Sequence, residues 1–144
     1  MPDCHKFPIR IYYEDTDSGG IVYYANYLRF AERARSEMLR EIGIESSSLM
    51  VNEGVALAVR RCNVDYYKPA RLDDLLNVET RLMALGGASI ELEQIIVREG
   101  QKLVRLELKL ACMAMDGRPS RLPSRLRDNL EPYSADIDVS KEQG

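Results

Sequence analysis

The feature that most constrains the fold is one long amphipathic helix, placed after a short β-prone segment and before a series of others. Between Asn26 and Ile42, charged residues alternate with an apolar stripe at helical spacing, made of Tyr27, Phe30, Ala31, Ala34, Met38 and Ile42. We predict a helix over residues 26–42, with Asn26 as its N-cap and Gly43 just beyond its end. No other stretch of the chain predicts a long helix.

The rest of the chain is typical of strands. β-prone segments lie at residues 7–13, 55–66, 76–82, 89–97 and 104–112, and several alternate apolar with polar residues. Gly86-Gly87 and Glu99-Gly100 separate the last three of them, which predicts hairpins. One helix among five strands predicts an α+β domain, with one antiparallel sheet curled around the helix. Because such a sheet has open edges, we also expect a homodimer that continues the sheet.

Length and composition favour a single globular domain. The chain has 144 residues, and we assign residues 1–132 to one domain and 133–144 to a polar, loose tail. With 20 basic and 23 acidic side chains, the composition argues against a nucleic-acid partner. No apolar run approaches the ~18 residues of a transmembrane helix, so we expect no transmembrane segment.

The cysteines and the N-terminus indicate the compartment. Cys4, Cys62 and Cys112 are an odd, widely spaced set, which fits neither a disulfide framework nor the usual zinc spacings. The first residues lack the apolar segment of a signal peptide. We therefore expect a cytoplasmic protein.

The single histidine, His5, limits the possible chemistry. Paired-histidine metal sites and Ser-His-Asp triads require histidines that the chain does not have. We therefore expect no metal and no cofactor. Any catalysis should depend on carboxylates or on backbone groups.

An acidic turn, residues 14–20, carries three carboxylates within four residues: Glu14, Asp15 and Asp17. One interpretation is a solvated loop, because turns favour Asp, Ser and Gly. A calcium loop is a poor match, since its twelfth position would be Asn26 in place of a bidentate glutamate. The third interpretation is an active site, in which a carboxylate lies beside the unpaired N–H groups of a helix start.

The turn and its surroundings resemble a known family. Residues 13–28 read Y-E-D-T-D-S-G-G-I-V-Y-Y-A-N-Y-L, followed by E-R-A-R at 32–35 and V-D-Y-Y-K-P-A-R-L-D-D at 64–74. These segments resemble the 4-hydroxybenzoyl-CoA thioesterase family, and most closely its branch of acyl-CoA thioesterases associated with the Tol-Pal system. The resemblance covers about residues 8–125. It implies the hotdog fold, in which a five-stranded antiparallel sheet wraps around one long central helix.

The resemblance also implies roles for individual residues. Asp17 corresponds to the family's catalytic carboxylate, which acts either as nucleophile or as general base. The backbone N–H groups of Tyr24 and Ala25 would stabilise the oxyanion. Tyr13 matches a tyrosine expected to assist, although it could equally be a strand tyrosine with a satisfied hydroxyl.

One position departs from the family pattern. Tyr24 stands where the branch commonly has a histidine, and a tyrosine with a reference pKa of ~10 can donate a hydrogen bond but cannot serve as a base near neutral pH. Tyr24 could therefore take part in catalysis or only line the pocket.

Coenzyme A carries phosphates, so the resemblance also implies basic residues around the site. The candidates for substrate binding are Arg60, Arg61, Lys68 and Arg71. Charged side chains on strands are also common on solvated faces, and this alternative stays open for each of them.

The predicted function is hydrolysis of an acyl-CoA thioester to a free carboxylic acid and coenzyme A, by a homodimer or a dimer-of-dimers tetramer. The alternative is a non-catalytic hotdog protein that binds acyl-CoA or acyl carrier protein, or that scaffolds a partner. Substitution of Tyr for His at position 24 is the feature that favours this alternative.

Overall fold

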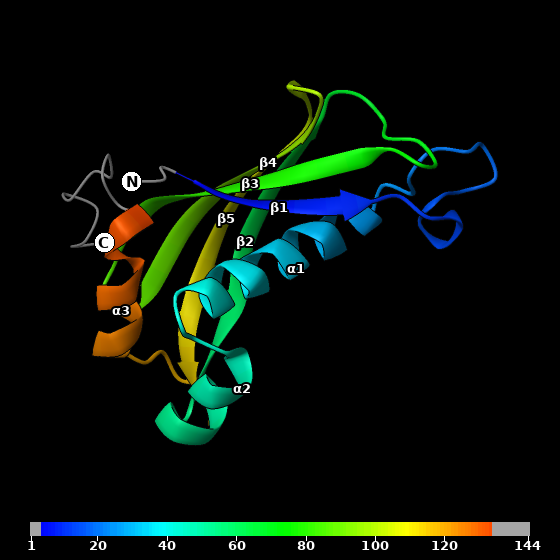
Figure 1. Cartoon of the computed structure of the whole chain (residues 1–144). Helices are drawn as coiled ribbons and strands as arrows, with labels where there is room; N and C mark the ends of the chain where they lie inside the picture. Colours follow the sequence, from blue (N-terminus) through cyan, green and yellow to red (C-terminus); the bar gives the residue numbers. More distant parts are fainter. Residues whose placement is uncertain (1–3, 134–144) are drawn as a thin grey trace.

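The computed structural model describes residues 4–133 and shows one long helix lying across the concave side of a single curved sheet (Figure 1). The chain begins with strand β1 (His5–Arg10) and continues, after the acidic turn, into helix α1 (Asn26–Glu41). The other elements are the short helix α2 (Ser46–Ser48), a π-helical turn η2 (Leu49–Glu53), the strands β2 (Val55–Tyr66), β3 (Leu75–Leu85), β4 (Ser89–Arg98) and β5 (Gln101–Ala114), and helix α3 (Ser124–Leu130). The predicted α+β class is confirmed.

The five strands form one antiparallel sheet in the order β1-β3-β4-β5-β2. The sheet therefore has β1 and β2 at its edges. β1 has only six residues and contains Pro8, which has no backbone N–H to donate. β2 is twice as long, with 12 residues, and contains no proline. The β4–β5 hairpin turns at Glu99 and Gly100, both of which have positive φ, as expected for a tight hairpin.

The strand predicted at 55–66 is confirmed, and the other strands differ from their predicted bounds, most importantly the first, which lies before the acidic turn. The first strand ends at Arg10 and does not reach Tyr13, because residues 13–15 form a 3₁₀ turn (η1, Tyr13–Asp15). The Asp15 carboxylate accepts the Tyr12 N–H at 2.9 Å and so closes that turn. Sequence reasoning also missed α3, whose signal is the helical spacing of Leu122, Leu126 and Leu130.

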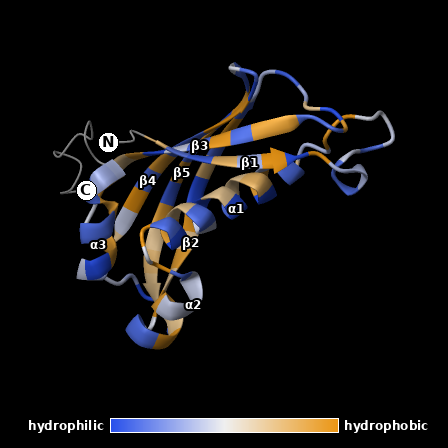
Figure 2. Cartoon of the chain, viewed as in Figure 1, coloured by the Kyte–Doolittle hydropathy of each residue, from blue (hydrophilic) through white to orange (hydrophobic). Residues whose placement is uncertain are grey.

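The core lies between α1 and the concave face of the sheet. The predicted apolar stripe of α1 is buried there, and Phe30 and Met38 are each only 2% exposed. Figure 2 shows hydrophobic and hydrophilic residues interspersed along the strands and along α1. Burial of a large apolar side chain contributes about 1.5–3 kcal/mol, so this stripe fixes the position of α1.

One hydrogen-bonded cluster interrupts this apolar contact. Gln94 of β4 is fully buried, and its amide N–H groups donate to the Ala31 carbonyl of α1 and to the Thr80 hydroxyl of β3, each at 2.9 Å. Its carbonyl oxygen accepts a hydrogen bond of 3.0 Å from Arg35. The buried amide is therefore satisfied, and it links α1 to two strands.

The C-terminal part packs against the far end of α1. Leu126, Leu130 and Tyr133 are buried in a cluster with Met38 and Ile44. Burial and the neighbouring Glu41 carboxylate raise the pKa of Tyr133 to about 12. The packed structure thus includes Tyr133, the first residue of the predicted tail. The rest of that tail, residues 134–144, lies outside the described residues.

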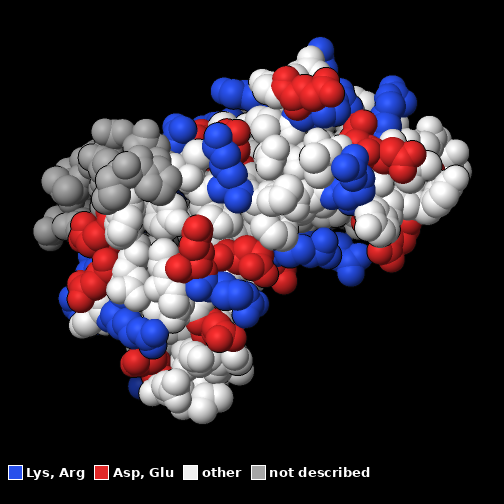
Figure 3. Space-filling view, viewed as in Figure 1, with Lys and Arg blue, Asp and Glu red and all other residues white. Residues whose placement is uncertain are grey.

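The outer face of the sheet is charged. Arg105 of β5 pairs with Glu93 at 2.8 Å and with Glu107 on its own strand. Figure 3 shows basic and acidic side chains interspersed over the molecular face in view. Within residues 4–133, no helix has the length and apolar character needed to cross a membrane.

The end of α1 depends on the backbone conformation of Gly43. Its φ is +84°, its N–H donates to the Arg40 carbonyl at 3.0 Å, and the Ile44 N–H donates to the Leu39 carbonyl at 2.8 Å. This pair of bonds is a Schellman C-cap. The predicted place of Gly43 beyond the end of the helix is confirmed, and the helix itself ends at Glu41, one residue before the predicted Ile42.

We expect Gly43→Ala to lower the free energy of unfolding by about 1 kcal/mol, since an alanine is strained at positive φ. The cost is conformational, because a Cβ at Gly43 would meet its nearest neighbour, Arg125, only at 3.7 Å. Urea denaturation measures the change. Gly87→Ala is the control, since Gly87 has no positive φ and has space for a Cβ. Equal effects of both substitutions would contradict this account.

Candidate active site

The acidic turn is a small, tightly bonded hairpin between β1 and α1. Thr16 and Val22 form its β-bridge, and the Asp17 N–H donates to the Ile21 carbonyl at 2.8 Å. The Gly20 N–H returns to the Asp17 carbonyl at 3.0 Å, with Gly20 at φ +79°. A left-handed residue is needed at this corner, which explains a glycine there.

Asp17 is the carboxylate that this hairpin presents to solvent. Its side chain is exposed, and Oδ1 accepts the Gly19 N–H at 2.8 Å. Within residues 4–133, Asp17 forms no ion pair and no other side-chain hydrogen bond. One carboxylate oxygen is therefore held by the backbone, and the other is available to a ligand.

Asp15 has the opposite role and is structural. Besides the bond from its carboxylate to Tyr12, its carbonyl accepts the Tyr23 N–H at 3.0 Å and the Asn26 side-chain amide at 2.9 Å. The prediction of Asn26 as the N-cap is wrong. Asn26 is the first helical residue, Ala25 occupies the N-cap position, and the Asn26 amide ties the helix to the acidic turn.

The start of α1 offers free backbone donors. In the described part of the chain, neither the Tyr24 N–H nor the Ala25 N–H has a protein acceptor. The Tyr24 carbonyl is engaged and accepts a hydrogen bond of 3.3 Å from the Tyr66 hydroxyl. Unpaired N–H groups at a helix start favour negative charge, so this end of α1 suits an oxyanion.

Tyr24 belongs to a cluster of tyrosines at this helix start. Its ring is 62% exposed and lies 5.0 Å from the Tyr23 ring and 6.2 Å from the Tyr66 ring, between centroids. Tyr66 also packs against Tyr27 at 5.8 Å. Burial, with Tyr24 and Cys62 nearby, raises the pKa of Tyr66. Sequence reasoning did not single out Tyr66, because its role depends on a contact 42 residues away.

Tyr13 directly precedes the acidic turn in the sequence and belongs to the 3₁₀ turn η1. Its ring is 81% exposed and lines an open cavity of about 420 Å³ with Arg10 and Leu72. Among the described residues, its hydroxyl has no hydrogen-bond partner and no contact with Asp17 is recorded. The structure thus leaves the Tyr13 hydroxyl free.

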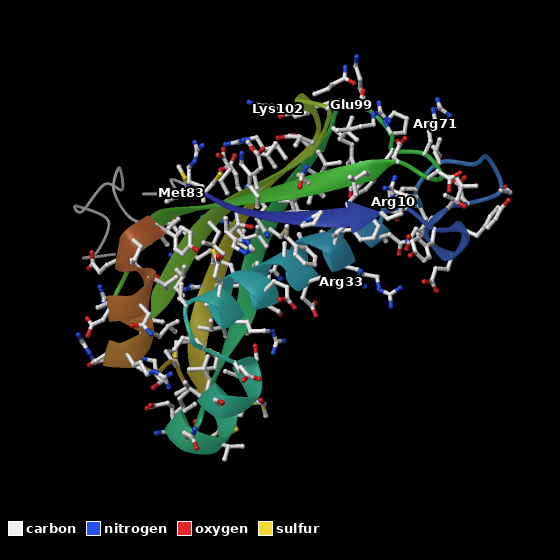
Figure 4. All side chains as sticks on the ribbon, in the orientation of Figure 1. Arg10, Arg33, Arg71, Met83, Glu99 and Lys102 are labelled. Atoms are coloured by element: carbon white, nitrogen blue, oxygen red, sulfur yellow. The ribbon has the colours of Figure 1, made fainter. Side chains whose placement is uncertain are left out.

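The four basic candidates fall into two groups. Arg71 forms a β-bridge with Ile21, so it lies directly beside the acidic turn, and Lys68 is on the same loop. Figure 4 shows Arg71 and Arg10 at the end of the molecule where the acidic turn lies. Arg60 and Arg61 lie on β2, and Arg61 lines a small recess with acidic residues of the outer sheet face. The structure therefore does not gather all four at one place.

The loop that carries Arg71 holds the turn in position. The Val22 N–H donates to the Ala70 carbonyl at 2.9 Å, and the Ala70 N–H donates to the buried Tyr27 hydroxyl at 2.9 Å. Asp74 anchors the loop through an ion pair of 2.6 Å with Arg98. Partial burial raises the pKa of Asp74, but hydrogen bonds from the Arg71 N–H and from Arg98 outweigh it, and the net effect is a lowered pKa.

The described residues contain no group of three or more metal-ligating side chains close enough to hold an ion. The acidic turn offers an exposed carboxylate, and the helix start that follows it in the chain offers two free N–H groups. Residues 12–130 match the thioesterase-like superfamily.

The chain belongs to the thioesterase-like superfamily. The match covers most of the chain and confirms the predicted resemblance, the hotdog fold and the predicted enzyme class, a thioester hydrolase.

Individual proteins similar to this chain support the assignment to the superfamily. The chain is 43% identical over 123 residues to the acyl-CoA thioester hydrolase YbgC of Escherichia coli O6:H1, covering 84% of this chain and 91% of that protein. It is 44% identical over 108 residues to the acyl-CoA thioesterase YbgC of Haemophilus influenzae, covering 75% and 79%. The crystal structure of a probable thioesterase from Bartonella henselae superposes with a TM-score of 0.81 at 39% identity, covering 83% and 99%.

We expect Asp74→Asn to lower the free energy of unfolding at neutral pH and to reduce the loss of stability at acid pH. A carboxylate whose pKa is lowered on folding stabilises the protein above its unfolded pKa, and that stabilisation is lost as the pH falls through the folded pKa. The wild type should therefore lose stability below about pH 4, and the variant should lose less over the same range. Urea unfolding at neutral and acid pH measures both slopes.

Asp73→Asn is the matched control. Asp73 is exposed, its side chain has no recorded partner within residues 4–133, and asparagine tolerates its φ of +71°. If Asp74→Asn followed the wild-type pH dependence, the Arg98 pair would not anchor the loop.

Proposed function

We propose that the protein is an acyl-CoA thioesterase that hydrolyses its substrate to a free carboxylic acid and coenzyme A, with Asp17 as the catalytic carboxylate. The observation that carries this proposal is the exposed Asp17 carboxylate, fixed by the Gly19 N–H on a turn that leads into a helix start whose N–H groups are unpaired. The names of the YbgC relatives support the substrate class.

The proposed chemistry uses the two halves of the site differently. The N–H groups of Tyr24 and Ala25 would bind the thioester oxygen and stabilise its negative charge as the carbonyl is attacked. Asp17 would either take a proton from the attacking water, or attack the carbonyl itself to form a mixed anhydride that water then hydrolyses. In both routes the C–S bond breaks and the coenzyme A thiolate leaves.

The two tyrosines have secondary roles in this proposal. Tyr24 contributes through its backbone N–H, while its ring forms part of the wall with Tyr23 and Tyr66. Tyr13 is a proposed helper, because its exposed hydroxyl is free to donate to the substrate.

Binding of the coenzyme A phosphates is proposed for the four basic side chains. Arg71 and Lys68 are best placed, since their loop adjoins the acidic turn. Arg60 and Arg61 on β2 would contribute at longer range. All four are exposed, so we expect their contribution to be screened by salt.

We also propose a homodimer, or a dimer of dimers, formed through β2. This edge strand is long, unprotected by proline and carries exposed apolar residues such as Val59. Pairing of two such strands would join two sheets into one. A cytoplasmic location stays a prediction.

We expect Asp17→Asn to lower the rate of thioester hydrolysis by about 10²–10⁴-fold, the usual contribution of a general base. A free-thiol assay against a panel of acyl-CoAs measures it. Glu14→Gln is the matched control. It removes a neighbouring carboxylate that has no hydrogen-bond or ion-pair partner among residues 4–133, so the variant should retain full activity.

The same assay distinguishes the alternative function. A wild-type protein that binds acyl-CoA without releasing thiol would be a binding protein rather than an enzyme. Turnover that survives Asp17→Asn unchanged would remove Asp17 from the mechanism, whatever the fold.

We expect Tyr24→Phe to keep kcat within about fivefold of the wild type, because an uncharged side-chain hydrogen bond is worth about 1 kcal/mol and the backbone N–H is retained. Steady-state kinetics with one acyl-CoA tests this expectation. A loss comparable to that of Asp17→Asn would instead place the Tyr24 hydroxyl in the reaction.

A further inference from the structure

The two free N–H groups at the start of α1 belong to two successive peptide units. In a trans peptide, the N–H of one residue and the carbonyl of the residue before it share a plane and point in opposite directions. Residues 4–133 contain no cis peptide bond. The Tyr24 N–H is therefore coupled to the Tyr23 carbonyl, and the Ala25 N–H is coupled to the Tyr24 carbonyl. Whatever holds these two carbonyls determines where the two N–H groups point.

The first of these peptide units is fixed by the backbone. The Tyr23 carbonyl accepts the Asn26 N–H at 2.9 Å, and the Tyr23 N–H donates to the Asp15 carbonyl at 3.0 Å. The side-chain amide of Asn26 donates to the same Asp15 carbonyl at 2.9 Å. The direction of the Tyr24 N–H thus follows from the acidic turn and the first helical residue.

The second peptide unit is not fixed by the helix. In a regular α-helix, the Leu28 N–H would donate to the Tyr24 carbonyl, four residues earlier. Here the Leu28 N–H donates to the Ala25 carbonyl at 3.2 Å instead. Among residues 4–133, the one recorded partner of the Tyr24 carbonyl is the Tyr66 hydroxyl, which donates to it at 3.3 Å. The direction of the Ala25 N–H therefore depends on a side chain at the end of β2.

The Tyr66 ring is itself held in place. It packs against the Tyr27 ring at 5.8 Å between centroids and lies edge-on to the Tyr24 ring at 6.2 Å. Tyr27 is only 3% exposed, and its hydroxyl accepts the Ala70 N–H at 2.9 Å, so it is a fixed support. Partial burial raises the pKa of Tyr66 above its usual range, so the hydroxyl keeps its proton at physiological pH and remains a donor.

We propose that Tyr66 is a positioning residue for thioester hydrolysis, whose hydroxyl holds the Tyr24 carbonyl so that the Ala25 N–H points at the thioester oxygen. This inference rests on the proposed function, in which that N–H stabilises the oxyanion. The bond also polarises the peptide unit and so strengthens the donor at its other end. Both effects count most when negative charge develops on the oxygen, which occurs in the transition state.

Tyr66→Phe tests the proposal, because it removes the hydroxyl and keeps the ring that packs against Tyr27. We expect kcat to fall about fivefold, as for the loss of one neutral hydrogen bond. KM should stay within about twofold of the wild type, since the bound thioester carries little negative charge before it is attacked. Steady-state kinetics with one acyl-CoA, followed by release of free thiol, measure both constants.

Backbone NMR of the labelled full chain gives a readout that does not need turnover. Loss of the bond to the Tyr24 carbonyl makes the peptide unit less polar, so the Ala25 amide resonance should move upfield in Tyr66→Phe. The amide resonance of Tyr24 should move less, because its peptide unit is held by Asn26.

Tyr67→Phe is the matched control. Tyr67 is the next residue and is 51% exposed, and its hydroxyl has no recorded hydrogen-bond partner within the part of the chain that the structure describes. The substitution removes the same group one residue away. It should leave kcat, KM and the Ala25 resonance at their wild-type values.

Three results would overturn the inference without touching Asp17. One is an Ala25 resonance that does not move in Tyr66→Phe, and another is an equal loss of kcat in Tyr66→Phe and Tyr67→Phe. The third is a wild-type kcat in Tyr66→Phe while Asp17→Asn loses turnover, since the reaction would then not use the peptide unit that Tyr66 holds. If the wild type releases no thiol from any acyl-CoA, the proposed function fails, and the inference fails with it.

Discussion

The contact between the apolar stripe of α1 and the concave face of the sheet is the interaction on which the other features depend. It places the start of the helix beside the acidic turn and the middle of the helix beside β2. Among residues 4–133, Gln94 is the one buried amide within this contact, and its hydrogen bonds hold the helix against β3 and β4. A shift of α1 by one residue would therefore displace the free N–H groups and Arg35 together.

The acidic turn gives different roles to two carboxylates, Asp15 and Asp17, that lie only two residues apart in the sequence. Asp15 accepts three hydrogen bonds. Its carboxylate accepts the Tyr12 N–H, and its carbonyl accepts the Tyr23 N–H and the Asn26 side-chain amide. Among the described residues, the Asp17 carboxylate accepts only the Gly19 N–H, which belongs to the same turn. The rigidity supplied by the first carboxylate is what allows the second to stay exposed yet positioned. An active-site carboxylate needs this combination of availability and fixed direction.

The sequence predicted the features that depend on local patterns. The period of α1, the alternation in β3 and β5 and the glycine after the helix are each contained in one short segment, and the structure agrees with them. Features that depend on distant contacts were missed. The hydrogen bonds from Tyr66 to Tyr24 and from Arg35 to Gln94 join residues 42 and 59 positions apart.

The wrong boundary predictions have the same origin. Asn26 has the side chain of a good N-cap, but its amide is used to reach Asp15, and only the fold determines which partner it finds. For the candidate site, the sequence and its family resemblance identified Asp17 and the helix start. They did not distinguish Arg71, which adjoins the turn, from Arg61, which lies among the acidic residues of the outer face.

The unequal edges of the sheet limit how copies of the chain can assemble. A sheet with two usable edges can add copies without end, and the product is a fibre. Here β1 is short and contains Pro8, whereas β2 is long and unobstructed. In the proposed dimer, pairing through β2 would use the long edge strand of both copies and would leave only the short β1 edges unpaired. Pro8 in the six-residue β1 would thus disfavour further strand pairing at that edge, which favours a closed oligomer over a fibre.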